Sequence, residues 1–121
     1  MNSLKNIAPK ILVVGDLMID YYLWGTSNRI SPEAPVQIID INNESKTLGG
    51  AGNVVNNLQS LGAKVDVISV IGDCKISDEI KELVNSIDVN TNYLIQENGR
   101  ISSKKTRIIS SQQQVVRYDI E

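Results

Sequence analysis

The sequence predicts an α/β fold, and three observations lead to that prediction. Ile11–Val14 and Lys64–Ile71 are rich in β-branched and aliphatic residues, as strands of a parallel sheet are when both of their faces are buried. Between them lies a stretch with the spacing of one helical face, formed by Val54, Val55, Leu58 and Leu61. Strand, helix and strand in this order make up the repeating unit of an α/β layer.

The segment between the first strand and the helix is predicted to alternate between strand and loop. Leu17–Trp24 is apolar and aromatic, as a strand is. Asn28–Pro35 has two prolines within four positions, which exclude a helix and a central strand, so we predict a loop. Val36–Ile41 again has the composition of a strand. The polar stretch Asn42–Thr47 is predicted to be a loop.

Three glycines stand within the four positions Gly49–Gly52, immediately before the predicted helix. Their backbone freedom lets a ligand approach closely, and a helix start offers unpaired N–H groups to a phosphate or to sugar hydroxyls. A purely structural glycine turn has the same composition, so both interpretations stay open. No Gly-Lys-Ser/Thr follows, which excludes a P-loop, and Val55 occupies the third glycine position of a dinucleotide fingerprint.

The second half of the chain continues the alternation of helix and strand. Gly62 ends the first helix, and Ser77 is the predicted N-cap of a second one. The apolar stripe of this second helix consists of Ile80, Leu83, Val84 and Ile87. A short strand is predicted at Val89–Gln96 and a turn at Glu97–Gly99. The last two strands form a hairpin, Lys104–Ile109 and Gln114–Ile120 around Ser110–Gln113.

We predict one unit over residues 1–121 that consists of two parts. An α/β part covers approximately residues 10–16 and 48–96. The remaining strands find few partners in that layer, so we expect them to form a small separate sheet from approximately residues 17–24, 36–41, 104–109 and 114–120.

Composition excludes several classes of function. The formal net charge is −2, with acidic and basic residues interspersed, so the basic excess of a nucleic-acid binder is absent. The chain has no histidine and only one cysteine, Cys74, which excludes a zinc site and a Ser-His or Cys-His nucleophile. We expect Cys74 to be an inert thiol in a reducing cytoplasm. No stretch approaches the ~18 apolar residues of a membrane span, so we expect a soluble, cytoplasmic protein with no membrane partner.

Five side chains are candidates for ligand binding. Asp16 and Asp20 follow the first strand, at the sheet edge where ligands of open α/β sheets bind, and a carboxylate there accepts hydrogen bonds from sugar hydroxyls. Asn53 can both donate and accept. Asp16 and Asp20 are also explained as turn or N-cap residues, and Asn53 as an ordinary residue at the start of a helix. Lys105 and Arg107 lie at i and i+2, hence on one strand face, where they meet one anion or form a solvated surface.

Four motifs in order carry a resemblance to a known family: Val14-Gly15-Asp16-x-Met18-x-Asp20, Arg29-Ile30-Ser31-Pro32-Glu33-Ala34-Pro35-Val36, Gly49-Gly50-Ala51-Gly52-Asn53-Val54 and Leu61-Gly62-Ala63. Together they resemble the ribokinase-type (PfkB) sugar kinases over essentially the whole chain, including Lys105-x-Arg107 and Gln113-Gln114-x-x-Arg117-x-Asp119. The Arg29–Val36 motif is similar to the N-terminal part of the heptose 7-phosphate kinase module in bifunctional enzymes of ADP-heptose synthesis.

The resemblance implies the N-terminal portion of a ribokinase-like three-layer α/β sandwich. A small β-sheet lid would cover the sugar site, and lid strands would pair in a homodimer. Asp20 would be the main acceptor for sugar hydroxyls, and the bases would face the sugar or its phosphate. The implied substrate-binding residues are Asp16, Asp20, Gly49, Gly50, Asn53, Lys105, Arg107 and Gln113.

The resemblance also implies a reaction. The γ-phosphoryl group of ATP, with Mg²⁺, would pass to the anomeric hydroxyl of D-glycero-β-D-manno-heptose 7-phosphate, a step toward lipopolysaccharide. In the family, a Gly-x-Gly-Asp segment in the C-terminal half supplies the catalytic base and the anion hole, near the nucleotide site. The present sequence contains no such run. We therefore expect a sugar-binding fragment that is inactive alone, with no catalytic, metal or nucleotide site of its own.

Two alternatives remain at this point. One is a non-catalytic module for sugar-phosphate binding or dimerisation. The other is a kinase of another sugar in the same superfamily, although the Arg29–Val36 motif argues against an adenosine or fructose-phosphate kinase.

Overall fold

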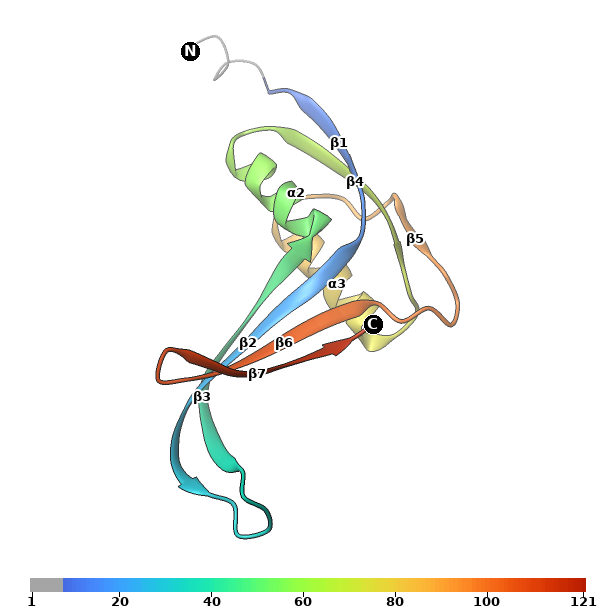
Figure 1. Ribbon diagram of the computed structural model, residues 1–121. Helices are drawn as coiled ribbons and strands as arrows, with labels where there is room; N and C mark the ends of the chain where they lie inside the picture. Colours follow the sequence, from blue (N-terminus) through green and yellow to red (C-terminus); the bar gives the residue numbers. More distant parts are fainter. Residues whose placement is uncertain (1–7) are drawn as a thin grey trace.

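The computed structural model describes residues 8–121 and contains two sheets (Figure 1). The first, termed the α/β sheet, is parallel and has the order β1-β4-β5, from β1 (Lys10–Val14), β4 (Lys64–Ile71) and β5 (Leu94–Gln96). The second, termed the lid sheet after the role that the resemblance predicts for it, has the order β3-β2-β6-β7, from β2 (Leu17–Ile30), β3 (Gln37–Gly50), β6 (Ser103–Ser110) and β7 (Gln113–Ile120). The predicted α/β fold with a separate small sheet is confirmed.

Two helices connect the strands of the α/β sheet. Helix α2 (Ala51–Ser60) begins directly after Gly50 and is followed by Gly62, which has a positive φ of 95°, as the sequence predicted. Helix α3 (Lys75–Ser86) begins at an N-cap formed by Cys74, so the prediction of Ser77 as N-cap is wrong. Ser77 is instead buried in the first turn, where its hydroxyl lies 2.7 Å from that of Ser102 and ties α3 to the segment before β6.

The hydrophobic core lies on one side of the α/β sheet. The buried residues come from β4, from both helices and the segments that follow them, and from the base of the lid sheet: Leu17, Ile19, Leu48, Val55, Ala63, Val65, Val67, Ile71, Ile80, Val84 and Val89. The other side of the sheet is open, because Leu12 is 55% and Val14 is 70% exposed. We predicted that both faces of β1 and β4 are buried. That prediction is wrong for residues 8–121, in which only one face of the α/β sheet is covered.

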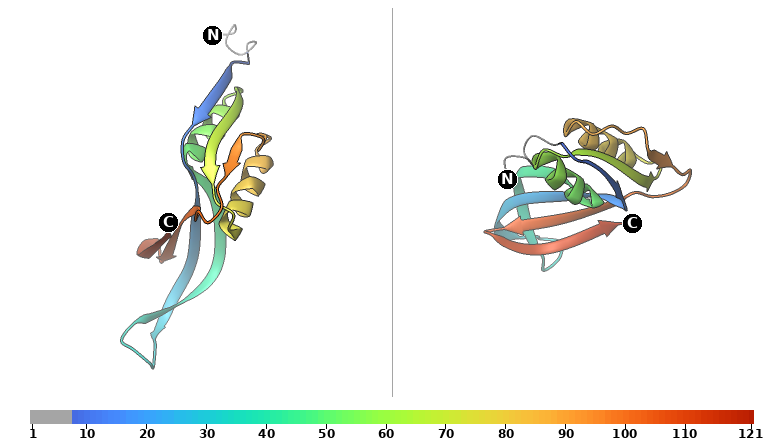
Figure 2. Two further views of the ribbon diagram at one scale, coloured as in Figure 1. Left: turned by 90° about the vertical axis from the view of Figure 1, so that its right-hand side faces the viewer. Right: turned by 90° about the horizontal axis from the view of Figure 1, so that it is seen from above.

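The hairpin of β2 and β3 is longer than the sequence predicted and projects away from the helices (Figures 1 and 2). Residues 28–30 continue β2, and only Ser31–Val36 bends, closed by a 2.8 Å hydrogen bond from Ser31 N–H to Val36 C=O. The predicted loop Asn42–Thr47 is strand, pairing with β2 at Leu23 and neighbouring positions. β3 is the edge of the lid sheet, so polar side chains there reach water while the backbone still pairs.

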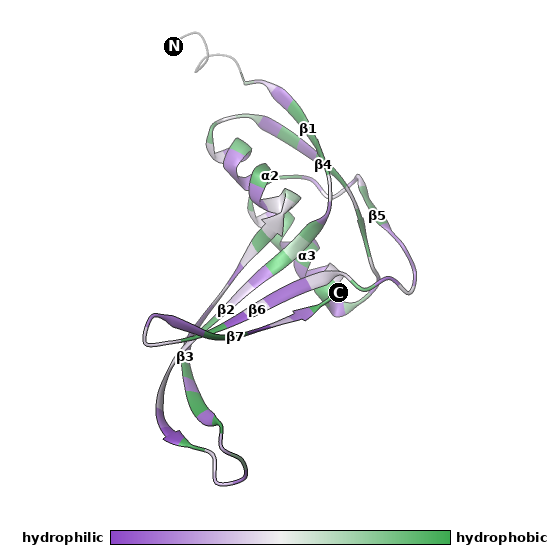
Figure 3. Ribbon diagram, in the orientation of Figure 1, coloured by the Kyte–Doolittle hydropathy of each residue, from purple (hydrophilic) through white to green (hydrophobic). Residues whose placement is uncertain are grey.

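Both strands of the second hairpin agree with their predicted bounds to within one residue at every end. β6 and β7 pair antiparallel, and the turn residues Ser111 and Gln112 both have positive φ, as in a two-residue type I′ turn. The predicted strand at Val89–Gln96 is reduced to β5. β6 pairs parallel to β2, which places the second hairpin beside the first. The middle of β6 is strongly hydrophilic (Figure 3), and its side chains supply much of the site described next.

Candidate functional site

The candidate site lies on one face of the lid sheet, termed the front face, which carries Asp20. Paired residues of neighbouring strands share a face, and alternate residues of each strand return to it. At the position of Asp20, the front face therefore also carries Thr47, Lys105 and Asp119. At the next position it carries Tyr22, Ser45, Arg107 and Arg117. Side chains from four strands, far apart in sequence, thus form one polar surface.

Two ion pairs organise the charges of the front face. Arg107 Nη1 donates a hydrogen bond to Asp20 Oδ1 at 2.9 Å, and both side chains are about four-fifths buried, with 20% and 23% exposed. Arg117 forms a bidentate pair with Asp119, with N–O distances of 2.8 and 2.9 Å. The hydrogen bonds from Arg117 hold the pKa of Asp119 below its usual value, because they stabilise the charged carboxylate.

Gly49 lies so close to Asp20 that any side chain there would displace the Asp20 carboxylate. It pairs with Met18 at the end of β3, and a Cβ built on it would overlap Oδ2 of Asp20. Gly50 has a φ of +59°, and a Cβ there would stand 2.7 Å from the carbonyl oxygen of Asp16. The backbone of Gly49 therefore packs against one side of the Asp20 carboxylate, while Arg107 binds it from another strand.

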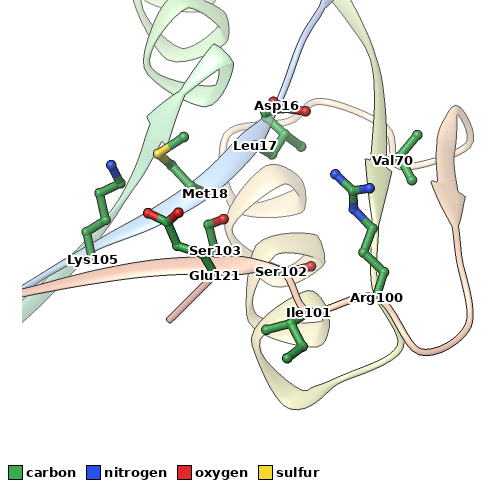
Figure 4. A pocket seen from close by; sticks show the side chains of 10 residues that line it. All are labelled: Asp16, Leu17, Met18, Val70, Arg100, Ile101, Ser102, Ser103, Lys105 and Glu121. Carbon is green, nitrogen blue, oxygen red and sulfur yellow. The ribbon is translucent and has the colours of Figure 1, made fainter. Parts of the chain in front are cut away.

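A cavity of about 260 Å³ opens beside the first positions of β2. Met18 and Lys105 lie on one side of it, and Arg100 and Val70 lie on the other (Figure 4). Asp16, which is exposed, also lines the cavity, and its carbonyl oxygen accepts a 2.9 Å hydrogen bond from Ala51 N–H. The cavity therefore combines two basic side chains, Arg100 and Lys105, with two acidic residues, Asp16 and Glu121, and these groups can bind the anionic and hydroxyl parts of a ligand such as a sugar phosphate.

Lys105 is the basic side chain of the front face with no ion-pair partner among residues 8–121. Its neighbours in register, Asp20 and Asp119, are occupied by Arg107 and Arg117. Lys105 also lines the cavity. Its ammonium group is therefore the charge on this face that a ligand anion can reach without displacing a carboxylate.

Of the predicted site residues, Asp16, Asp20, Gly49, Gly50, Lys105 and Arg107 lie around the start of the lid sheet. Asn53 lies in the first turn of α2, three residues after Gly50, with an exposed side chain. Gln113 lies apart, because it pairs with Ser110, which pairs with Gly25. Gly25 is five residues beyond Asp20, so the separation is about 17 Å at 3.4 Å per residue.

Sequence reasoning missed Arg100 and Ser103, which line the cavity, and did not include Arg117 in the site. A signal for Arg100 existed, since it follows the turn after β5 and ligands gather at the carboxyl ends of parallel strands. Arg117 pairs with Arg107 across the β6–β7 hairpin and so lies on the same sheet face as Arg107 and Lys105. That position depends on the register of the hairpin, which the sequence did not fix.

Cys74 has an environment that the sequence did not reveal. Burial raises the pKa of its thiol, but hydrogen bonds from the Ser77 hydroxyl, at 3.4 Å, and from nearby backbone N–H groups outweigh this effect. The resulting pKa is about 7, below the usual value of a cysteine. The thiol is half-buried at the N-cap of α3, so it is more acidic than the inert thiol that we expected.

Within residues 8–121, no three carboxylate or thiol groups gather closely enough to hold a metal ion. The glycine segment packs against the backbone carbonyl of Asp16 and the carboxylate of Asp20, and that carboxylate would repel a triphosphate. In the same residues, no helix is long and apolar enough to cross a membrane.

Comparison with known proteins gives consistent matches. Residues 8–119 match the pfkB family of carbohydrate kinases. The chain is 62% identical, over 93% of its length, to the bifunctional protein HldE of Aliarcobacter butzleri strain RM4018, and 56% identical over its whole length to HldE of Sulfurimonas denitrificans. It covers 24% and 25% of those proteins, so it spans about a quarter of the length of the curated relatives it matches.

Solved structures share the fold at low identity. A carbohydrate kinase from Agrobacterium tumefaciens superimposes with a TM-score of 0.68 at 22% identity, covering 93% of this chain and 35% of that one. Arabidopsis thaliana ribokinase, solved with ribose and ATP, superimposes with a TM-score of 0.63 at 17% identity, covering 94% of this chain and 36% of that one. The fold is therefore ribokinase-like.

Proposed function

Since the chain belongs to the pfkB carbohydrate kinase family, we propose that its front face and the adjoining cavity bind the sugar substrate of an ATP-dependent kinase. The substrate that we propose is D-glycero-β-D-manno-heptose 7-phosphate, phosphorylated at its anomeric hydroxyl on the way to ADP-heptose and lipopolysaccharide. The Arg29–Val36 motif and the similarity to HldE over more than nine-tenths of the chain support this choice.

The observation that carries the proposal is the environment of Asp20. Its carboxylate is held by Arg107 at 2.9 Å and packs against the backbone of Gly49, so its direction is fixed before a ligand arrives. A fixed carboxylate accepts hydrogen bonds from two neighbouring sugar hydroxyls without first losing its own freedom. Lys105, which is next to Asp20 in register and lines the cavity, then neutralises the phosphate of the substrate.

The contribution of these residues to phosphoryl transfer is binding and orientation. ATP and Mg²⁺ would supply the transferred group and neutralise its charge. The sequence has no Gly-x-Gly-Asp run to act as base and anion hole, and residues 8–121 contain no cluster of three side chains that could hold a metal ion. We therefore propose that the 121-residue chain binds the sugar but has no kinase activity by itself. We also propose that it works in the cytoplasm, whose reducing conditions suit its free cysteine.

A second candidate function, as a dimerisation module, is favoured by one observation. The face of the lid sheet opposite Asp20, termed the back face, has an apolar groove of about 630 Å³ in its outer half. Its lining includes Val36, Ile39, Ile41, Ile108, Val115 and Val116. An exposed apolar surface of this kind is typical of a protein interface. We propose that it pairs two copies of the chain through their lid strands.

Calorimetric titration of the 121-residue chain tests the proposed function. Heptose 7-phosphate is expected to bind, with fructose 6-phosphate and ribose at least tenfold weaker. Tighter binding of either control sugar would assign another kinase of the superfamily, and no binding of any sugar phosphate would overturn the proposal. A coupled assay for ADP release with heptose 7-phosphate and MgATP checks the expected inactivity, which measurable turnover would contradict.

A further inference from the structure

The inner half of the back face contacts helix α3 through a group of charged side chains. Tyr21 lies on the central strand β2, and its neighbours in register are Lys46 on β3 and Thr106 on β6. Lys104, two residues before Thr106, also faces this side. Glu79 extends from α3 toward both lysines. These residues lie behind Asp20, on the side of the sheet that the proposed substrate does not reach.

The distances show that one carboxylate bridges two strands. Lys46 Nζ lies 3.7 Å from Glu79 Oε1, and Lys104 Nζ lies 3.6 Å from Glu79 Oε2. The Lys104 ammonium is 4.5 Å from the centre of the Tyr21 ring, and that of Lys46 is 6.0 Å from it. Tyr21 is thus flanked by two cations that are both attracted to the same residue of α3.

The bridge is partly withdrawn from water. The side chains of Glu79 and Lys104 are 16% and 18% exposed, and Oε2 of Glu79 is buried without a hydrogen-bond partner among residues 8–121. A charge in such a place depends on its ion-pair partners, because water compensates little of its desolvation. The hydroxyl of Tyr21 donates a hydrogen bond to Glu44 farther along β3, so the ring is held at its outer end as well.

Tyr21 and Asp20 are consecutive in β2 and point to opposite faces. Whatever fixes Tyr21 against α3 therefore fixes the backbone that carries Asp20. We infer that Glu79 is a positioning residue: by binding Lys46 and Lys104 on both sides of Tyr21, it holds β2 so that Asp20 faces the substrate. This inference rests on the proposed function, in which Asp20 accepts hydrogen bonds from the sugar.

The test compares Glu79→Gln with Glu82→Gln in the 121-residue chain. Both changes remove one carboxylate from α3, but Glu82 is exposed and forms no ion pair among the described residues. Titration with heptose 7-phosphate is expected to show a Kd about three- to tenfold higher for Glu79→Gln and within twofold of wild type for Glu82→Gln. Amide hydrogen exchange is expected to become faster in β2 and β6 of Glu79→Gln, but not in α2.

A double-mutant cycle separates positioning from general stability. In the double variant with Glu79→Gln and Lys104→Gln, neither residue 79 nor residue 104 carries a buried charge without its partner. The Kd of the double variant for heptose 7-phosphate is therefore expected to be no higher than the higher Kd of the two single variants. Additive losses would overturn the inference. The inference would also be overturned if Glu79→Gln changed neither the Kd nor the amide hydrogen exchange, or if its faster amide exchange were spread evenly over the chain. If the wild-type chain binds no sugar phosphate, the proposed function fails, and exchange in β2 and β6 decides alone whether Glu79 restrains β2.

Discussion

The guanidinium of Arg107 donates a hydrogen bond from Nη1 to Oδ1 of Asp20 at 2.9 Å, joining two residues that are 87 positions apart in sequence. The two residues lie on adjacent parallel strands, β6 and β2, and face the same side of the lid sheet. Asp20 therefore has its orientation set by a residue of the second hairpin, and the front face forms only when both hairpins are in place.

Removing the guanidinium is expected to weaken sugar binding. Arg107→Met keeps the aliphatic stem but leaves the largely buried carboxylate of Asp20 without its partner, so the free energy of unfolding should fall by about 1–2 kcal/mol. The Kd for heptose 7-phosphate should rise at least tenfold in a calorimetric titration. As a control for stability, Arg29→Met removes an ion pair with Asp40 whose side chains are 66% and 64% exposed, and should cost less than about 0.5 kcal/mol. Equal binding by Arg107→Met and wild type would contradict the proposed role.

Adding one methyl group at Gly49 is expected to abolish sugar binding. The Cβ of Gly49→Ala would overlap Oδ2 of Asp20 and force the carboxylate away from Arg107, at a cost of about 1–3 kcal/mol in unfolding free energy. Gly62→Ala is the comparison, because it introduces strain at a φ of +95° with no neighbour within 4 Å, far from the site. That variant should lose about 1 kcal/mol of stability and retain its affinity. If both variants bind equally well, Gly49 has only a structural function.

A charge in the apolar groove is expected to separate two copies of the chain. Val116 is 46% exposed and lines the groove on the back face, so Val116→Lys would place an ammonium group in the proposed interface. Sedimentation velocity should show a dimer for wild type and a monomer for the variant. Val54→Lys, at a residue that is 48% exposed on α2, should remain dimeric. A wild-type chain that stays monomeric at high concentration would rule out the groove as a dimer interface.

The Cys74 thiol is expected to be alkylated readily at neutral pH. With a pKa of about 7, half of the thiol is ionised at pH 7, and only the thiolate reacts. The rate of reaction with iodoacetamide should therefore rise with pH and reach half of its plateau near pH 7. Ser77→Ala removes a hydrogen bond that favours the thiolate, so its midpoint should move to higher pH. An identical pH profile for the two proteins would show that Ser77 does not lower the pKa.

Two valines on the helices test the assignment of the core. Val84 on α3 is fully buried, whereas Val54 on α2 is 48% exposed. Val84→Ala should lower the free energy of unfolding by about 2 kcal/mol, because it removes buried apolar surface and leaves a small cavity. Val54→Ala should change it by less than about 0.5 kcal/mol. Urea denaturation measures both values. Equal effects would mean that α3 does not pack on the sheet as the structure shows.

The predictions that held were those based on strong local signals. The apolar periodicity of Val54, Val55, Leu58 and Leu61 located α2, and the β-branched run Lys64–Ile71 located β4 with its correct ends. Val54 and Leu61 do not belong to the buried face of the helix, because they are 48% and 83% exposed. The polar stretch Asn42–Thr47 was misassigned, because polarity reports exposure, and an edge strand can be exposed and still be paired. Ser77 was misassigned as a cap, because its hydroxyl is used by Ser102, a residue that the sequence separates from it by 25 positions.

The sequence by itself determined the fold class, the helices and the chemical types of the site residues, because these depend on periodicity and composition within a few neighbouring positions. Only the tertiary structure decided which of those residues meet. It placed Arg107 on Asp20, set Gly49 against the same carboxylate, left Lys105 facing the cavity and carried Gln113 away to the hairpin tip. The physical reason is that strand register is fixed by packing between distant segments, and a shift of one residue would turn every one of these side chains to the other face.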